Sequence, residues 1–217
     1  WARLLATTSL EGGEALTTGL DGSIYIAGTT RGDLDGQINN GSDDAFLSKF
    51  NPDGTKEWTR LLGTSSSENG KSLTTGLDGS IYIAGTTQGD LDGQTNNGDL
   101  GLDTFISKFN TDGTKVWTRL LGPTYLSALT TGSDGSIYIA GNTSGDLDDQ
   151  INNGSSDVCL IKLNTDGTKI WTRLLGSSSR DGSEDLTIGI DGSIYISGYT
   201  NFESYTNRGS TLDGQTN

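Results

Sequence analysis

The chain repeats nearly the same phrases four times, and this repetition limits the possible folds more than any other feature. The phrase Asp-Gly-Ser-Ile-Tyr-Ile begins at Asp21, Asp78, Asp134 and Asp191. The phrase Trp-Thr-Arg-Leu-Leu-Gly begins at Trp58, Trp117 and Trp171, and Trp1 begins a variant of it. A period of about 57 residues indicates an array of supersecondary units, none of which buries its apolar surface alone. The repeats divide the chain into residues 1–57, 58–116, 117–170 and 171–217.

Each repeat contains four short segments with the composition of β-strands. In the unit 14–62 they are residues 15–18, 23–27, 45–50 and 57–62. Asp-Gly turns join the first pair and the last pair, which is a strong hairpin signal because glycine accepts the positive φ of a tight turn. The second segment is apolar on both faces, so we expect it between two layers. The fourth carries Arg60, which suits an outer edge strand.

Four-stranded antiparallel units in tandem are typical of the blades of a β-propeller. The sequence therefore predicts an all-β fold with about four such blades. Residues 1–217 are expected to form a single propeller domain or a segment of a larger propeller. Only 31% of the residues are apolar, and 33 are glycine, as expected for short strands joined by many turns.

Two stretches of the sequence resemble a known repeat family. Asp44 to Trp58 reads Asp-Ala-Phe-Leu-Ser-Lys-Phe-Asn-Pro-Asp-Gly-Thr-Lys-Glu-Trp, and Asp78 to Thr87 reads Asp-Gly-Ser-Ile-Tyr-Ile-Ala-Gly-Thr-Thr. This pattern resembles the bacterial "seven-bladed β-propeller" repeat family and covers essentially the whole chain. The resemblance implies a propeller, usually within larger secreted or cell-surface proteins, and no common catalytic activity. The chain departs from the family pattern because it has four repeats instead of seven.

The strand count is one short of four complete blades. Residues 1–5 supply an outer strand, and the last repeat supplies only residues 186–189 and 193–197, without a third strand. The first strand of the chain would then lack a neighbour. We expect that the chain is a segment of a longer repeat array or that another copy supplies the strand. A four-bladed ring that closes imperfectly is the alternative.

Charge and composition exclude several classes of function. The net charge is −14, which argues against nucleic acid and anionic lipid as partners. No apolar run of about 18 residues is present, so no membrane insertion is expected.

The chain has no histidine, which excludes a serine triad and a histidine-based zinc site. Because the glutamates form no recurring acid–base pair, the sequence predicts no enzyme. The single cysteine, Cys159, is expected to be a small buried apolar residue.

The longest connections between strands are acidic and repeated. The segment 32–44 recurs with small changes at 89–103 and 145–157. Antiparallel order places both Asp-Gly turns of a blade at one end and its long loops at the opposite end. Long loops often carry function, so the long-loop face is the expected binding face for a protein or a glycan.

These loops gather the hard oxygen ligands that Ca²⁺ prefers. The candidate metal ligands are Asp33, Asp35, Asn39, Asp90, Asp92, Asn96, Asp146, Asp148 and Asn152. The spacing lacks the third acidic position and the bidentate glutamate of an EF-hand loop. The alternative is a solvated turn in which Asp and Asn side chains bond to their own backbone. A fourth copy, at 211–214, lacks the first carboxylate and would be the weakest site.

The sequence therefore predicts a non-catalytic binding or structural scaffold module of an extracellular or cell-surface protein, stabilised by calcium if the loops bind it. The alternative is a lectin-like carbohydrate-binding propeller, in which aromatic rings receive sugar faces. The tryptophans and repeated tyrosines lie inside strands, where core residues are expected. Three aromatics lie outside the repeated strands: Tyr125, Phe202 and Tyr205.

Overall fold

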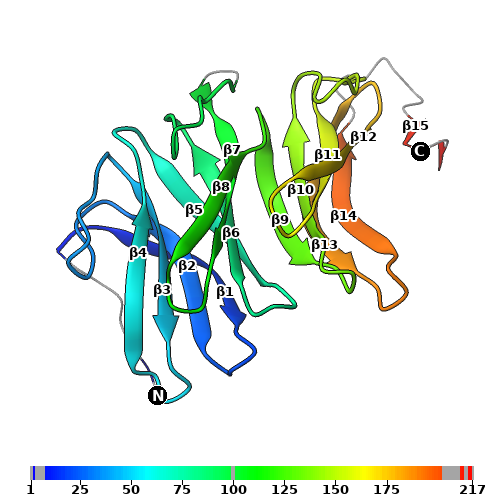
Figure 1. Ribbon diagram of the computed structural model, residues 1–217. Helices are drawn as coiled ribbons and strands as arrows, with labels where there is room; N and C mark the ends of the chain where they lie inside the picture. The colour runs from blue at the N-terminus through cyan, green and yellow to red at the C-terminus, as the bar shows by residue number, and fades with distance from the viewer. Residues whose placement is uncertain (1, 3–7, 99–100, 202–210, 213–214, 217) are drawn as a thin grey trace. The chain divides into compact units, whose positions relative to one another are not determined.

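The computed structural model shows an all-β chain (Figure 1). It describes residues 2, 8–98, 101–201, 211–212 and 215–216. Among these residues, no helix is long and apolar enough to cross a bilayer. The chain divides into two compact units, Trp1–Leu121 and Gly122–Asn217.

The first unit contains two four-stranded antiparallel sheets, each a simple meander in chain order. The first sheet consists of β1 (Glu11–Thr18), β2 (Ile24–Thr30), β3 (Asp44–Phe50) and β4 (Lys56–Leu62). The second consists of β5 (Glu68–Thr75), β6 (Ile81–Thr87), β7 (Asp103–Phe109) and β8 (Lys115–Leu120). These are the predicted propeller blades.

The second unit repeats this pattern. Its four-stranded sheet consists of β9 (Tyr125–Thr131), β10 (Ile137–Thr143), β11 (Asp157–Leu163) and β12 (Lys169–Leu175). A two-stranded sheet follows, formed by β13 (Arg180–Ile188) and β14 (Ile194–Asn201). Two further short strands pair with each other: β15 (Thr211–Leu212) and β16 (Gln215–Thr216).

Tight turns and long loops lie at opposite ends of each complete sheet, as predicted. In the first sheet Gly22 has a φ of 79° and Gly54 a φ of 82°, which an Asp-Gly turn allows without steric cost. A side chain on Gly22 would lie 3.5 Å from the Pro52 ring, so the two turns are neighbours. The loop from residue 31 to residue 43 leaves the other end.

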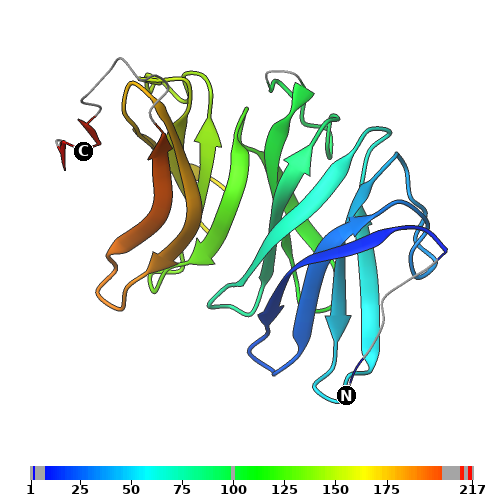
Figure 2. The same cartoon turned by 180° about the vertical axis from the view of Figure 1, so that it is seen from behind.

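The sheets of the first unit stack through the first strand of the second sheet. β5 lies against β1, β2 and β3, and Figure 2 shows β1 and β5 as neighbours. The hydroxyls of Thr17 and Thr75 are 3.2 Å apart, and the Glu68 amide donates to the Asp43 carbonyl at 2.7 Å. The small, threonine-rich first strand of the second sheet therefore fits closely against the first sheet.

A glycine in the second strand permits a close contact with the first strand of its blade. A Cβ on Gly85 would lie 1.9 Å from the Asn69 carbonyl oxygen and 2.8 Å from the ring of Phe105. The first strand bulges at this point, between Gly70 and Ser72. Any side chain here would separate the three inner strands, so glycine is required by the fold.

The core of the first unit fills the space between its two sheets. Phe105 is fully buried in one cluster with Ala45, Leu62 and Ile83. All seven residues of β6 are buried, as expected of a strand between two layers, whereas β2, for which the prediction was made, keeps Ile24 and Ile26 half-buried. In the second unit β13 lies against β9, β10 and β11 in the same manner, with Leu186 in the core.

The strands extend beyond the predicted segments, and the differences have physical reasons. β1 begins at Glu11 instead of Ala15, because residues on both sides of a bulge at Gly13 pair with β2. β2 and β14 are less buried than β6. The expected strand over residues 1–5 and the loop aromatics Phe202 and Tyr205 lie outside the described residues.

Candidate functional site

Each long acidic loop is built around a tight turn and a buried leucine. In the first loop the amide of Leu34 donates to the Gln37 carbonyl at 3.0 Å, and the reverse bond is 2.9 Å. Asp35 and Gly36 between them have φ values of 53° and 75°, the left-handed pair of a type I′ turn. Leu34 is 1% exposed and anchors the turn to the sheet. The same turn recurs at Leu91–Gln94 and Leu147–Gln150.

The first aspartate and the asparagine of each loop bond to the loop itself. Asp33 Oδ1 accepts a hydrogen bond from the Asn39 amide at 2.9 Å. The Asn39 side chain donates to the Thr30 carbonyl at 3.0 Å and accepts from the Gly41 amide at 3.0 Å. The same contacts tie Asn96 to Asp90 and Asn152 to Asp146. These bonds fix the loop, while Asp33 and its two counterparts stay exposed.

The second aspartate of each loop is paired with a lysine on the fourth strand. Asp35 accepts hydrogen bonds from Lys56 Nζ and Thr59 Oγ1. Burial raises the pKa of Asp35, but the bonds from Lys56 and Thr59 outweigh it and hold the pKa below its ordinary value. The two equivalent pairs are Lys115 with Asp92 at 2.6 Å and Lys169 with Asp148 at 2.5 Å.

These lysines and threonines belong to the candidate site, although the sequence pattern did not point to them. Their signal was present, since Lys56 follows an Asp-Gly-Thr turn that recurs, and Thr59 follows a recurring tryptophan. Strand periodicity shows which face a residue occupies but not which loop lies over that face. The contact between the long loop and the fourth strand therefore required the folded structure.

The arrangement bears on the predicted calcium ligands. Among the described residues, no group of three or more Asp, Glu, His or Cys side chains is placed to hold a metal. Ca²⁺ requires six to eight oxygen ligands, and the Asp35 carboxylate is already neutralised by Lys56. The observed contacts are those of the self-bonded turn, the alternative that the sequence left open. Calcium binding at these loops stays a prediction.

A second set of acidic residues is buried where the third strand of each blade begins. Asp44, Asp103 and Asp157 are at most 1% exposed, and the Oδ1 atom of each has no hydrogen-bond partner. Asp157 has a second buried acid, Asp181, beside it, whose Oδ1 also has no partner. Burial raises the pKa of Asp157, the Asn153 amide opposes this, and the charge of Asp181 adds to the rise. Burial likewise raises the pKa of Asp44, and the charge of Glu68 adds to the rise.

One of the three acidic loops has backbone strain at a position where the other two loops have glycine. Asp149 has a φ of 60° at the position where the other two loops carry Gly36 and Gly93. A left-handed conformation costs a non-glycine residue about 1 kcal/mol. We expect Asp149→Gly to raise the free energy of unfolding by about that amount, measured by denaturant or thermal unfolding.

The control for this change is Gly93→Asp. No heavy atom lies within 4 Å of a Cβ placed there, so this variant tests backbone strain without a steric clash. It should lower the stability by a similar amount. Equal stability of both variants and the natural protein would contradict the strain argument.

The buried acids predict an unusual dependence of stability on pH. The folded-state pKa of Asp157 lies above its unfolded value, so its contribution to stability falls as pH rises from about 3.8 through the folded pKa. Asp157→Asn keeps an oxygen acceptor for the Asn153 amide and removes the charge. We expect it to stabilise the protein at neutral pH and to lose this advantage near pH 4.

The matched control is Asp134→Asn at a tight turn. Its bond with Lys162 lowers the pKa of Asp134 and outweighs the opposing effect of burial, so this charge stabilises the fold above the ordinary pKa. The control should therefore lower the melting temperature at neutral pH and less so in acid. If Asp157→Asn lowers stability equally at both pH values, the unpaired carboxylate is not the source of the effect.

Comparison with known proteins agrees with this architecture. The β-propeller repeat model SBBP matches residues 57–92. A β-propeller domain of unknown function, DUF5122, matches residues 20–57 and 132–169. Regulatory protein FlaEY from Caulobacter vibrioides is 30% identical over 193 residues, which cover 79% of this chain. The chain spans about a fifth of that relative, 20% of its length.

A solved structure shows the same fold. A protein of unknown function from Bacteroides caccae is similar with a TM-score of 0.52 and 8% sequence identity. The similarity covers 86% of this chain and 53% of that protein. At this identity it supports the fold alone, which is the all-β blade arrangement described above. The repeated phrases, the antiparallel blades and the matching repeat models together show that the chain belongs to the β-propeller repeat proteins.

Proposed function

We propose that this chain is a non-catalytic binding scaffold that presents one acidic loop repeatedly to a protein partner. The observation that carries the proposal is the construction of the loop. The same type I′ turn, buried leucine and self-bonded asparagine occur in three successive blades. A loop that is already fixed loses little conformational entropy on binding, and weak contacts that are repeated add by multivalency.

The charges that remain available define the partner. Asp35 and its two counterparts are neutralised by lysines, whereas Asp33, Asp90 and Asp146 are exposed, and each bonds only with a backbone amide among the contacts described above. An exposed carboxylate at the same place in each loop favours a basic protein surface and steers its approach. The resemblance to repeats of secreted and surface proteins supports an extracellular or cell-surface location.

The aromatic residues support a protein partner over a glycan. Tyr25 and Tyr82 are fully buried and Trp58 is 9% exposed, so they are core residues and not platforms for sugar rings. Tyr125, at the start of β9, is exposed but occurs once. The lectin-like alternative predicts a signal on a glycan array that falls when Tyr125 is replaced.

Neutralising the exposed loop aspartates tests the proposed binding surface. In the triple variant Asp33→Asn, Asp90→Asn and Asp146→Asn, each asparagine still accepts the backbone amide bond, so the fold is retained. We expect binding to a panel of basic peptides to weaken at least fivefold at physiological salt, measured by biolayer interferometry, because three of the surface charges are lost.

A matched control places the same charge change at the opposite ends of the sheets. Asp53, Asp112 and Asp166 lie in the Asp-Gly turns, and each accepts a bond from a backbone amide. Their triple replacement by asparagine also removes three charges. Binding that weakens equally in both triple variants would show attraction by net charge alone and would refute a specific loop surface.

We also propose that these loops bind Ca²⁺, and this binding would require ion pairs of the loops to be broken. Ca²⁺ at Asp35 has to displace Lys56, and the same holds at Asp92 and Asp148. The triple variant Lys56→Met, Lys115→Met and Lys169→Met frees these carboxylates. If calcium binds, it should raise the melting temperature more in this variant than in the natural protein, and chelator should reverse the rise. No shift in either protein would remove the calcium prediction.

A further inference from the structure

Two pairs of buried acids lie where one blade passes to the next. In the first unit Asp44 begins β3 and Glu68 begins β5, and both are 0% exposed. In the second unit Asp157 begins β11 and is 0% exposed, and Asp181 lies at the start of β13 and is 1% exposed. Each pair therefore joins the third strand of one blade to the first strand of the following blade.

The two acids of the first pair meet at one short stretch of backbone. A Cβ on Gly63 would lie 2.1 Å from Asp44 Oδ1, so the Asp44 carboxylate rests directly on this glycine. The next residue, Thr64, donates its amide to Glu68 at 2.5 Å and its hydroxyl at 2.9 Å. The Glu68 amide in turn donates to the carbonyl of Asp43 at 2.7 Å. The carboxylates of Asp44 and Glu68 are therefore held beside consecutive residues of the connection between β4 and β5.

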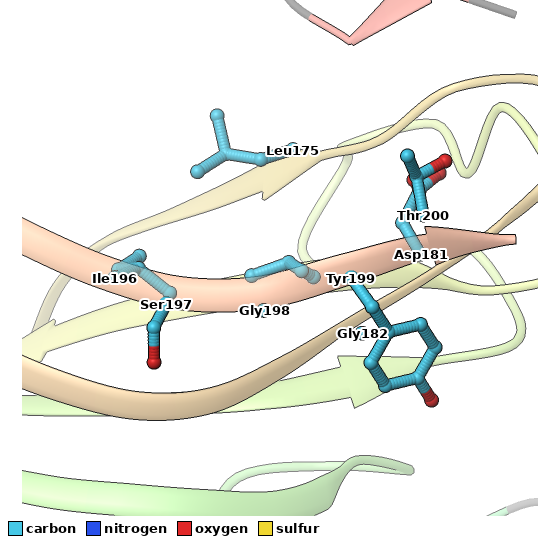
Figure 3. Close-up of a pocket in the computed structure, with 9 residues that line it drawn as sticks. Leu175, Asp181, Gly182, Ile196, Ser197, Gly198, Tyr199 and Thr200 are labelled. Carbon is cyan, nitrogen blue, oxygen red and sulfur yellow. The ribbon is translucent and has the colours of Figure 1, made fainter. Parts of the chain in front are cut away.

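The second unit repeats this construction. A Cβ on Gly176 would lie 2.2 Å from Asp157 Oδ1. Ser177, the next residue, donates its amide to Asp181 at 2.6 Å and its hydroxyl at 2.9 Å. Figure 3 shows Asp181 beside Thr200, with which it pairs across β13 and β14. A glycine followed by a hydroxyl residue thus receives an acid pair in both units.

Each pair contains a carboxylate oxygen that has no partner among the described residues. In Asp44 and Asp157 this atom is Oδ1, while Oδ2 accepts the amide of Asn40 or Asn153. Asp181 Oδ1 is a further oxygen of this kind. No lysine or arginine of the described chain forms an ion pair with any of the four acids. Buried carboxylates need such a partner, because a charge that is removed from water is costly unless it is paired or neutralised.

The chemistry of the pairs selects a divalent cation. A proton would neutralise one carboxylate of a pair and leave the other charged, whereas a divalent cation balances both. The acceptors at each pair are carboxylate and hydroxyl oxygens, which are hard ligands of the kind that Ca²⁺ prefers. Because a pair holds only two acids, hydroxyl and backbone carbonyl oxygens would complete the coordination, and Ca²⁺ accepts such mixed oxygen ligands.

We infer that each buried acid pair is a structural Ca²⁺ site that ties one blade to the next. One site is Asp44 with Glu68, and the other is Asp157 with Asp181. Repeat units are stable only against their neighbours, so a cation shared between two blades would strengthen the contact on which the array depends. These sites use none of the loop residues considered above for calcium, and they do not depend on the proposed binding function.

The second blade has an acid at the same place without a partner acid. Asp103 begins β7, is 1% exposed, and its Oδ1 also has no partner. At the repeat position of Glu68 and Asp181, the following blade carries Thr124. Burial raises the pKa of Asp103, opposed by an amide bond, and no second carboxylate adds to the rise. One carboxylate cannot balance a divalent cation, so no site is expected here.

Calcium titration by isothermal titration calorimetry tests the inference on protein that has first been stripped with chelator. We expect Asp44→Asn and Asp157→Asn each to bind one equivalent fewer than the natural protein, and the double variant two fewer. The matched control is Asp103→Asn, which removes the same charge from the same place in the repeat and should lose none. All of these variants keep the acidic loops, so any calcium bound there is unchanged.

Melting temperatures give a second readout. Calcium should raise the melting temperature of the natural protein more than that of the double variant. In chelator Asp157→Asn should keep the gain in stability expected above at neutral pH, because no cation then balances the buried charge. If Asp44→Asn does not fold, Glu68→Gln removes the other charge of the same pair and should lose the same equivalent.

Three results would overturn the inference. The first is equal calcium binding by the natural protein and the double variant, and the second is the loss of an equivalent in Asp103→Asn. The third is a stability of the natural protein that changes with pH but not with calcium, which would assign a shared proton to each pair. None of these results bears on the acidic loops as a surface for a basic partner.

Discussion

The fold depends on a close approach of backbones at one glycine of each blade. A Cβ at Gly28 or Gly85 would lie 1.9 Å from a carbonyl oxygen of the first strand, and at Gly198 the distance would be 2.2 Å. The first strand can therefore bulge toward the second, and a bulge increases the local twist. In the first unit the close contact at Gly85 lies beside the buried ring of Phe105, and the first strand that approaches Gly85 is β5, which packs on the preceding sheet. The apolar core therefore depends on a position that has no side chain.

Charge pairing inside the blades explains how so acidic a chain keeps ordered strands. In the first and second blades the lysine of the third strand lies over the ring of the second-strand tyrosine and forms an ion pair with the aspartate of the tight turn. In the first blade Lys49 is closer to Glu57, at 2.9 Å. Lys49 is 6% exposed, and losing its partners would leave a buried charge uncompensated. The opposite end of each blade uses Lys56 or its counterpart to neutralise the second loop aspartate. A net charge of −14 thus overstates the negative charge that a partner can meet.

The sequence was sufficient for the blades because their signals are local. The Asp-Gly turns, the apolar second strand and the repeat period predicted the strand order, and the structure has it. The roles of individual acids were less predictable, because they depend on contacts between segments far apart in the chain. Asp35 and Asp44 are both loop or strand-end aspartates in the sequence, yet one pairs with Lys56 and the other is buried with an unpaired oxygen. The bulge that extends β1 to Glu11 likewise depends on pairing with β2.

The exposure of equivalent residues differs from blade to blade. A repeat unit buries its faces only against neighbours, so a sheet with one free edge exposes groups that its siblings bury. In the described part of the chain, Tyr195 of the two-stranded sheet is 57% exposed, whereas Tyr25 and Tyr82 are 0% exposed. The proposed loop surface depends instead on Asp33, Asp90 and Asp146, which are exposed at the same place in three successive loops. An attraction that rests on exposed charge is screened by salt, so binding at this surface should weaken as the ionic strength rises.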